Sequence, residues 1–164
     1  MKGKDVNTEK GKDATAKERI AMDYFTKHTK LGAIETPKER IAAVDGFLVN
    51  AERRIVGIYE VKARGVSLKE FKNFGSWLVS YDKIRIACML SKALQVSFVA
   101  IVLTSDYKLM VFKITDEDGN IILPCRIEKT KTQETCNGGE ANRVNMFFSI
   151  DDCKVFEKPK DDLK

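Results

Sequence analysis

Apolar and polar positions follow a helical rhythm near the start of the chain. Ile20, Tyr24 and Phe25 recur at helical spacing behind Thr15, a residue type that caps helices. The pattern predicts an amphipathic helix over residues 16–28.

The next pattern is typical of a β-hairpin. A short extended segment is expected at 31–35, and an apolar run at 41–49 is broken only by one acid and one glycine. A run rich in β-branched and aromatic residues follows at 55–61, and the polar segment 50–54 separates the two runs. We therefore expect the two runs to pair as antiparallel strands.

A helix is predicted to begin after Ser67. Ser67 and Glu70 fit a capping box, in which each side chain accepts a hydrogen bond from the other residue's exposed amide. Gly75 weakens the middle of the apolar pattern, and Asp82 is a candidate cap for a helix over 83–94. One broken helix and two short helices both fit the pattern. The apolar positions at helical spacing are Leu68, Phe71, Phe74, Leu78 and Tyr81.

The second half of the chain is predicted to be mainly β-structure. A continuous apolar run at 96–104 has the length of a buried strand, and 108–115 alternates well enough to return antiparallel to it. Further strand candidates at 121–127 and 144–150 flank the polar stretch 128–142, which we interpret as a loop. The expected order is helix, three strands, one or two helices, and more strands.

The composition fits one domain. The chain has 164 residues, of which 43% are hydrophobic, enough to bury an ordinary core. Residues 1–14 lack apolar periodicity and are expected to form a flexible basic arm, and 157–164 a charged flexible tail that contains a proline. The predicted folded domain is 15–156.

The termini and cysteines bear on the compartment. The first residues are charged, and the longest apolar stretch is too short to span a bilayer, so we expect a cytoplasmic protein with no membrane partner. The four cysteines show no CxxC spacing, and the single histidine, His28, leaves few partners for a zinc site. Reduced thiols are expected.

The charge balance adds a mild bias towards a polyanionic partner. Lysine and arginine total 29 against 24 acidic residues, which gives a net charge of +5. Such an excess is compatible with nucleic acid as a partner, although many basic proteins never bind it.

Candidate chemistry begins with the segment Glu60-Val61-Lys62. In a strand, residues two apart share a face, so Glu60 and Lys62 should project together while Val61 points the other way. The similar Glu70-Phe71-Lys72 lies in a predicted helix, where positions two apart diverge. That second segment is therefore interpreted as surface charge.

Asp45 is expected to face Glu60. The midpoint between them falls inside the polar turn, so a symmetric hairpin places the two carboxylates opposite each other. Opposed like charges are unfavourable unless a cation lies between them, and Mg²⁺ prefers one or two carboxylates with waters and phosphate oxygens. The Val61 carbonyl is a candidate further ligand. Lys62 could position a nucleophilic water or neutralise developing charge, and Glu18 could bind metal-bound water or join the metal shell.

A purely structural explanation stays open at this point. Asp45 would then occupy a bulge beside Gly46, and Glu60 and Lys62 would form a solvated ion pair on one face.

The pattern resembles the PD-(D/E)XK, restriction-endonuclease-like nuclease superfamily, which has phage and mobile-element members. The similarity covers roughly 16–115 and consists of the helix with Glu18, the segments 44–47 and 58–62, and the helix after Ser67. It implies an α/β (α+β) fold with an αβββαβ core, in which helices flank a central mixed sheet and additional strands follow. It also implies that Asp45 and Glu60 bind Mg²⁺ or Mn²⁺, that Lys62 assists the water, and that Glu18 contributes.

Two departures refine the resemblance. Val44 stands where the family motif nominally has proline, a position that is loose in the family. The glutamine and tyrosine helix motif of the exonuclease branch is not evident over 67–83. An endonuclease is therefore favoured over an exonuclease.

These observations predict a compact Mg²⁺-dependent deoxyribonuclease whose partner is DNA, and dimerisation would let it cut both strands. Two alternatives stay open: a nucleic-acid-binding or assembly module on the same fold without catalysis, and an interaction protein whose acids hold a structural cation or a partner's basic surface. Candidate DNA contacts are Arg64, Lys72 and Lys83, with Trp77, Tyr81 and the basic segment 129–131 as further candidates; Trp77 and Tyr81 are more often core residues than base-stacking ones.

Overall fold

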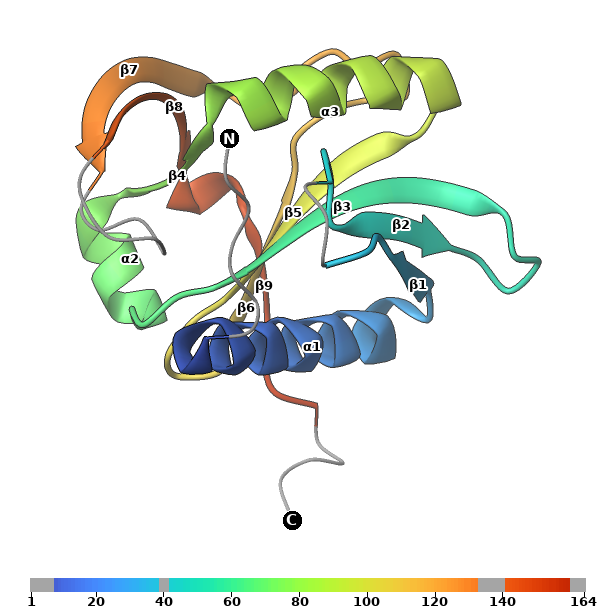
Figure 1. Ribbon diagram of the computed structural model, residues 1–164, viewed down its shortest axis with the longest axis horizontal. Helices are drawn as coiled ribbons and strands as arrows, with labels where there is room; N and C mark the ends of the chain where they lie inside the picture. The colour runs from blue at the N-terminus through green and yellow to red at the C-terminus, as the bar shows by residue number, and fades with distance from the viewer. Residues whose placement is uncertain (1–7, 39–41, 133–140, 160–164) are drawn as a thin grey trace.

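The computed structural model describes residues 8–38, 42–132 and 141–159. It is a mixed α+β fold with a six-stranded central sheet, a smaller three-stranded sheet and three α-helices. Figure 1 shows α1 against one face of the central sheet, with α3 and the smaller sheet on the opposite side. The expected order of one helix followed by three strands is confirmed, but the two helices that come next are separated by a strand that the sequence did not predict.

Helix α1 spans Glu9–Thr29, so the start predicted at residue 16 is wrong. Residues 9–14, assigned from the sequence to an irregular arm, are helical; residues 1–7 lie outside the described ranges. Thr8 is the true cap, because its side chain accepts a hydrogen bond from the Gly11 amide. Thr15 lies inside the helix, where its hydroxyl donates to the Gly11 carbonyl.

The central sheet has the strand order β1-β2-β3-β5-β6-β9. Its strands are β1 (Gly32–Glu35), β2 (Gly46–Val49), β3 (Ile55–Ala63), β5 (Ser97–Leu103), β6 (Leu109–Lys113) and β9 (Lys154–Phe156). β3 and β5 run parallel, and the other neighbours are antiparallel. The short β9 was not predicted from the sequence.

The hairpin of β2 and β3 has the predicted register from Gly46 to Leu48, but it is not symmetric throughout, because the pairing shifts by one residue between Leu48 and Val49. Gly46 pairs with Tyr59 and Phe47 with Ile58, so the next step of the ladder places Asp45 opposite Glu60. The predicted start of the first strand is wrong, however, because β2 begins at Gly46; residues 39–41 lie outside the described ranges.

Two helices follow β3, and an unpredicted strand separates them. α2 (Leu68–Phe74) has the expected capping box between Ser67 and Glu70, and it ends at Gly75, whose φ is 75°. β4 (Ser76–Ser80) comes next, followed by α3 (Tyr81–Leu94). Leu78 of β4 falls at helical spacing from the apolar residues of α2 only by coincidence, which is why the sequence pattern suggested a helix there.

The smaller sheet has the order β4-β8-β7. β7 (Cys125–Thr132) and β8 (Ala141–Ser149) extend well into the stretch interpreted as a loop, so the predicted boundaries are wrong; 133–140 lie outside the described ranges. Ile121 forms only an isolated bridge with Thr115. A 3₁₀ turn, Ile150–Asp152, leads from β8 towards β9.

Two apolar clusters lie on the two faces of the central sheet. Met22, Tyr24 and Phe25 of α1 pack with Tyr59 and Val61 on one face, among other residues. The other cluster joins the central sheet to α3 and the smaller sheet.

Trp77, Tyr81 and His28 lie in three different environments. Trp77 is buried in the second cluster and stacks on Phe112 with a centroid distance of 5.1 Å, so it is a core residue. Tyr81 is more exposed, at the start of α3. His28 stacks on Phe156 and contacts the Glu157 carbonyl through Nε2 at 2.7 Å, which ties the end of α1 to the chain after β9.

The expectations about thiols and membrane helices concern the described residues only. Cys88, Cys125 and Cys153 are free thiols there, and Cys136 lies outside these ranges. Within the same ranges, no helix combines the length and apolar character needed to cross a membrane.

Candidate functional site

The candidate site lies at the start of β2, where the antiparallel strand β3 extends beyond it. Asp45 immediately precedes β2, and its amide donates to the Tyr59 carbonyl at 3.1 Å. Beyond this point β3 extends to Ala63. There the Asp45 side chain replaces the backbone as the hydrogen-bond partner of β3, because the Val61 amide donates to Asp45 Oδ2 at 2.8 Å. The carboxylate is therefore held by the sheet itself.

Thr36 holds the backbone of the same segment. Its hydroxyl lies 2.7 Å from the Val44 carbonyl and 3.1 Å from the Asp45 carbonyl, and its amide donates to the Asp45 carbonyl at 2.9 Å. These bonds fix the backbone of Val44 and Asp45 directly before β2. This role of Thr36 could not be predicted from the sequence, because nothing in a lone threonine before a proline indicates its partners.

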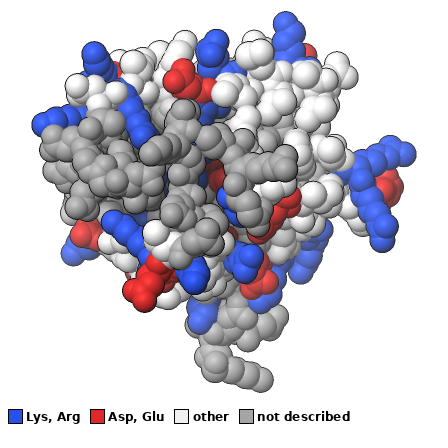
Figure 2. Space-filling model, viewed as in Figure 1, with Lys and Arg blue, Asp and Glu red and all other residues white. Residues whose placement is uncertain are grey.

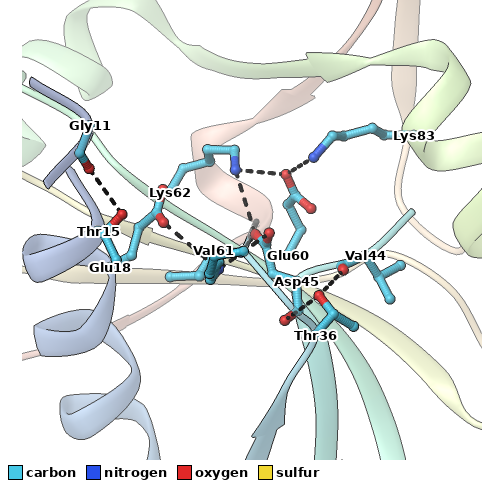
Figure 3. Close-up of polar contacts among 11 residues, drawn as sticks. Gly11, Thr15, Glu18, Thr36, Val44, Asp45, Glu60, Val61, Lys62 and Lys83 are labelled. Atoms are coloured by element: carbon cyan, nitrogen blue, oxygen red, sulfur yellow. Dashed lines mark hydrogen bonds and ion pairs between the residues drawn. The ribbon is translucent and has the colours of Figure 1, made fainter. Parts of the chain in front are cut away.

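Glu60 and Lys62 project together from β3, as predicted, while Val61 packs into the cluster beneath α1. Lys62 Nζ lies 2.8 Å from Glu60 Oε1 and 3.5 Å from Asp45 Oδ2. Figure 3 shows this ammonium group between the two carboxylates. The hairpin therefore brings together the three residues selected from the sequence.

Helix α3 contributes a second cation. Lys83, in its first turn, forms an ion pair with Glu60 Oε1, so Glu60 lies between Lys62 and Lys83 (Figure 3). The Glu60 side chain is only 3% exposed. A carboxylate buried to this degree requires such partners, because its loss of hydration is otherwise costly.

Helix α1 and the segment before β2 complete the cluster. Lys38 Nζ lies 3.9 Å from Glu18 Oε2 and 3.6 Å from Asp45 Oδ1. Glu18 is therefore placed next to Asp45 through Lys38, which the sequence analysis did not select. The six residues Glu18, Lys38, Asp45, Glu60, Lys62 and Lys83, called the acid–lysine cluster below, contain three acids and three lysines.

The charges fix the ionisation of Asp45 and Lys62. Burial raises the pKa of Asp45. The charge of Lys62, the hydrogen bond from the Val61 amide and the charges of Lys38 and Lys83 together outweigh burial, so this pKa lies below its ordinary value. Burial lowers the pKa of Lys62, but the charges of Glu60, Asp45 and Glu18 outweigh it and raise that pKa. Asp45 is therefore an anion and Lys62 a cation near neutral pH.

The cluster offers two carboxylates and one backbone carbonyl, oxygen ligands of the kind that a hard divalent cation takes. Asp45 and Glu60 each have an oxygen within 3.5 Å of the Lys62 nitrogen, so the Lys62 ammonium occupies the place where the two carboxylates meet. Val61 directs its amide at Asp45, and in a strand the carbonyl of the same residue points to the same side. Among the described residues, no group of three or more His, Cys, Asp or Glu side chains is placed to hold a metal ion. Mg²⁺ commonly binds through one or two carboxylates and completes its shell with water and phosphate oxygens.

Two predicted DNA contacts are not part of the cluster. Arg64 is exposed just after β3, where its guanidinium contacts the Ala63 carbonyl at 3.3 Å. Lys72 is exposed on α2, and its charge acts on the Cys153 thiol. Within the described residues, no contact joins Lys72 to the cluster acids. The predicted basic loop, 129–131, belongs to β7 instead.

The surface charge is interspersed. Figure 2 shows one face, on which Asp and Glu side chains lie among the Lys and Arg side chains where grey atoms do not cover it. On α1, for example, Lys17 pairs with Asp13 at 2.9 Å and Lys27 with Asp23 at 2.9 Å. The net charge is therefore weak support for a polyanion-binding face.

Comparisons with protein-family models, with curated proteins and with solved structures found no match to this chain. The interpretation of the site therefore depends on its geometry and chemistry.

Proposed function

We propose that this protein is a metal-dependent deoxyribonuclease with its active site in the acid–lysine cluster. The observation that carries the proposal is the placement of Asp45 and Glu60 on either side of Lys62, at the point where β3 continues beyond β2. Two strand carboxylates beside one strand lysine provide ligands for a divalent cation and a positive charge for a phosphoryl group.

Asp45, Glu60 and the Val61 carbonyl would hold the cation, Mg²⁺ or Mn²⁺. When bound, the cation would lower the pKa of a bound water and polarise a phosphoryl oxygen. Glu18 lies 3.9 Å from Lys38, and its charge acts on Lys62, so it would accept hydrogen bonds from water beside the cation.

Lys62 would act as a cation rather than as a base. The charges of Glu60, Asp45 and Glu18 raise its pKa against the effect of burial, which favours the ammonium form. A protonated lysine can orient the attacking water and stabilise the negative charge that develops on the phosphoryl oxygens. Lys83 would orient Glu60, to which it is bound, and offers charge to the substrate phosphate.

The order of elements supports the same proposal. α1, the three antiparallel strands β1 to β3, α3 and the parallel strand β5 follow the helix and strand order of a restriction-endonuclease-like core, with α2 and β4 inserted before α3. Fold alone does not define activity, so the residues of the cluster carry the argument.

One observation favours a different function. Glu60 accepts from both Lys62 and Lys83, and the cluster has as many lysines as acids. Such a cluster is balanced without a metal ion. A nucleic-acid-binding or assembly module that keeps the fold without catalysis is therefore the second candidate, and it predicts salt-sensitive DNA binding without cleavage.

Cleavage assays separate the two candidates. Circular and linear DNA, single- and double-stranded, are incubated with wild type in Mg²⁺, Mn²⁺ or EDTA. The variants are Asp45→Asn and Lys62→Met, and the control is Lys17→Gln, which removes a lysine from the exposed face of α1.

Wild type and the control should cut in either metal and not in EDTA, and both site variants should lose about 100-fold or more in rate. Cutting of the circular substrate would identify an endonuclease. A folded wild-type protein that binds DNA but cuts nothing in either metal would instead establish the non-catalytic module.

A further inference from the structure

A basic cleft lies beside the acid–lysine cluster, between the first half of α1 and the segment that leads to β2. Its volume is about 490 Å³. Lys12, Thr15 and Arg19 line it from one face of α1, where residues three, four and seven apart lie together. Glu35, Thr36 and Lys38 line the other side.

We propose that this cleft, called the α1 cleft below, binds the phosphodiester backbone of the substrate strand next to the bond that is cut. The inference deepens the proposed nuclease function by assigning a substrate-binding site, and it names residues that lie outside the acid–lysine cluster.

The charges of α1 favour an anionic occupant. Lys17 and Lys27 are neutralised by acids one helical turn away. No ion pair links Lys12 or Arg19 to an acid among the described residues, and both are exposed side chains that line the cleft. With Lys38, these two cations outnumber the one acid of the described lining, Glu35, and this excess of positive charge at a concave surface attracts phosphate.

Two residues connect the cleft to the cluster. Lys38 lines the cleft, and its ammonium nitrogen lies 3.6 Å from Asp45 Oδ1. Thr36 also lines the cleft and holds the Asp45 carbonyl through its hydroxyl and its amide. A strand with its reacting phosphate at Asp45 and Glu60 would therefore continue directly into the α1 cleft.

The chemistry of the lining favours the backbone over the bases. The Thr15 and Thr36 hydroxyls already donate to backbone carbonyls, which leaves the cationic side chains as the main donors. None of the described lining residues is aromatic, so the cleft offers no platform for base stacking. Binding should therefore be insensitive to base sequence and strongly sensitive to salt.

Binding can be measured apart from cleavage, with a fluorescent oligonucleotide in EDTA over a range of salt concentrations. The variants are Lys12→Gln, Arg19→Gln and their combination, and the matched control is Lys17→Gln on the same helix. The double variant should bind about 10-fold or more weakly at low salt, with the slope of log K against log salt reduced by about 1–2. The control should stay within about twofold of wild type.

Glu35→Gln tests the cleft in the opposite direction. Glu35 is the one acidic side chain among the described residues that line the cleft. Its neutralisation should tighten oligonucleotide binding by about twofold or more, because it removes a repulsion of the phosphates. In Mg²⁺, the double variant should raise KM while kcat stays within about threefold of wild type, because the cleft binds the strand away from the reacting atoms.

The outcomes distinguish this inference from the proposed function. Equal losses of binding in Arg19→Gln and in Lys17→Gln, each of which removes one positive charge from α1, would overturn the cleft, because net charge alone would then explain them. Metal-dependent cleavage with KM and salt slope unchanged in the double variant would leave the nuclease standing and overturn the cleft. Selective loss of binding in a protein that never cuts DNA would support the cleft and overturn the nuclease, and a wild type that neither binds nor cuts would overturn both.

Discussion

The Val61 amide donates to Asp45 Oδ2 over 2.8 Å, in the place where a further residue of β2 would have paired with β3. The Asp45 side chain thus continues the hydrogen bonding between the two strands beyond the last backbone pair. One consequence is that the carboxylate orientation is set by the sheet, and another is that Asp45 contributes to the stability of the site as well as to its charge.

The stabilising effect of the Asp45 charge should depend on pH. Its folded-state pKa lies below its ordinary value of 3.8, because Lys62, the Val61 amide, Lys38 and Lys83 outweigh the effect of burial. The unfolded chain therefore binds the proton more readily, so this stabilisation is complete above the unfolded pKa and is lost as pH falls through the folded pKa.

Urea unfolding of wild type and Asp45→Asn tests this dependence. Asp45→Asn should be less stable than wild type at pH 7, and the difference should shrink as the pH falls below about 4. A difference in the free energy of unfolding that stays constant down to strongly acidic pH would assign the effect to hydrogen-bond geometry instead of charge.

Glu60 and Lys83 should differ in the cost of neutralisation. Glu60→Gln leaves Lys62 and Lys83 without their shared, 3%-exposed carboxylate, whereas Lys83→Gln leaves Glu60 paired with Lys62. We expect Glu60→Gln to lower the free energy of unfolding by about 2–4 kcal/mol, because two lysines lose their buried partner. Lys83→Gln should lower it by about 1 kcal/mol, because Lys83 is partly exposed and Glu60 keeps Lys62.

Chemical denaturation of both single variants and of the double variant measures this asymmetry. The double variant should cost less than the two single changes added together, because the residues share one ion pair. Equal costs for the single variants, or full additivity, would contradict the described arrangement.

Gly46 should not tolerate a side chain. A Cβ there would lie 2.3 Å from the Ile34 carbonyl oxygen and 2.6 Å from the hydroxyl of Tyr59, which is fully buried. Gly46→Ala should therefore cost about 2–3 kcal/mol through overpacking and displace Asp45. At Gly65, the matched control, a Cβ meets nothing within 4 Å. Thermal unfolding should show a large loss for Gly46→Ala and little change for Gly65→Ala; similar midpoints would contradict the close packing at Gly46.

Thr36 should act as a positioning residue for Asp45. Thr36→Val keeps the shape of the side chain but removes the hydroxyl that donates to the Val44 and Asp45 carbonyls. We expect a loss of about 1 kcal/mol in stability and a reduction of kcat larger than the change in KM.

Thr29→Val is the control for Thr36→Val. Its hydroxyl donates to the Phe25 carbonyl at 2.8 Å, at the far end of α1 from the residues that line the cleft. Steady-state cleavage kinetics should be unchanged in this variant. If both variants lowered kcat equally, general destabilisation would explain the result, and the positioning role of Thr36 would be wrong.

Local patterns were sufficient for several parts of the fold. The polar turn and the two apolar runs predicted the register that places Asp45 opposite Glu60, because a hairpin is a local structure with a period of two. The capping box at Ser67 and Glu70 was likewise predicted, since its two partners lie within one turn. The start of α1 was wrong because few apolar residues mark its first turns.

Elements with distant partners could not be predicted in this way. β4 pairs with β8, and β9 with β6, so each short strand is stabilised by residues far along the chain. In isolation, the sequence of β4 fits a continued helix as well as a strand. Such short segments take their structure from their tertiary partners.

The sequence by itself determined the pairing of Asp45 with Glu60 and the shared face of Glu60 and Lys62, because both follow from strand geometry within one hairpin. Only the tertiary structure decided that Lys83 of α3 and Lys38 complete the cluster, and that Lys12 and Arg19 line a cleft beside it. The physical reason is that these side chains meet across separate elements, and packing of the helices against the two faces of the sheet, not any local pattern, sets their distances.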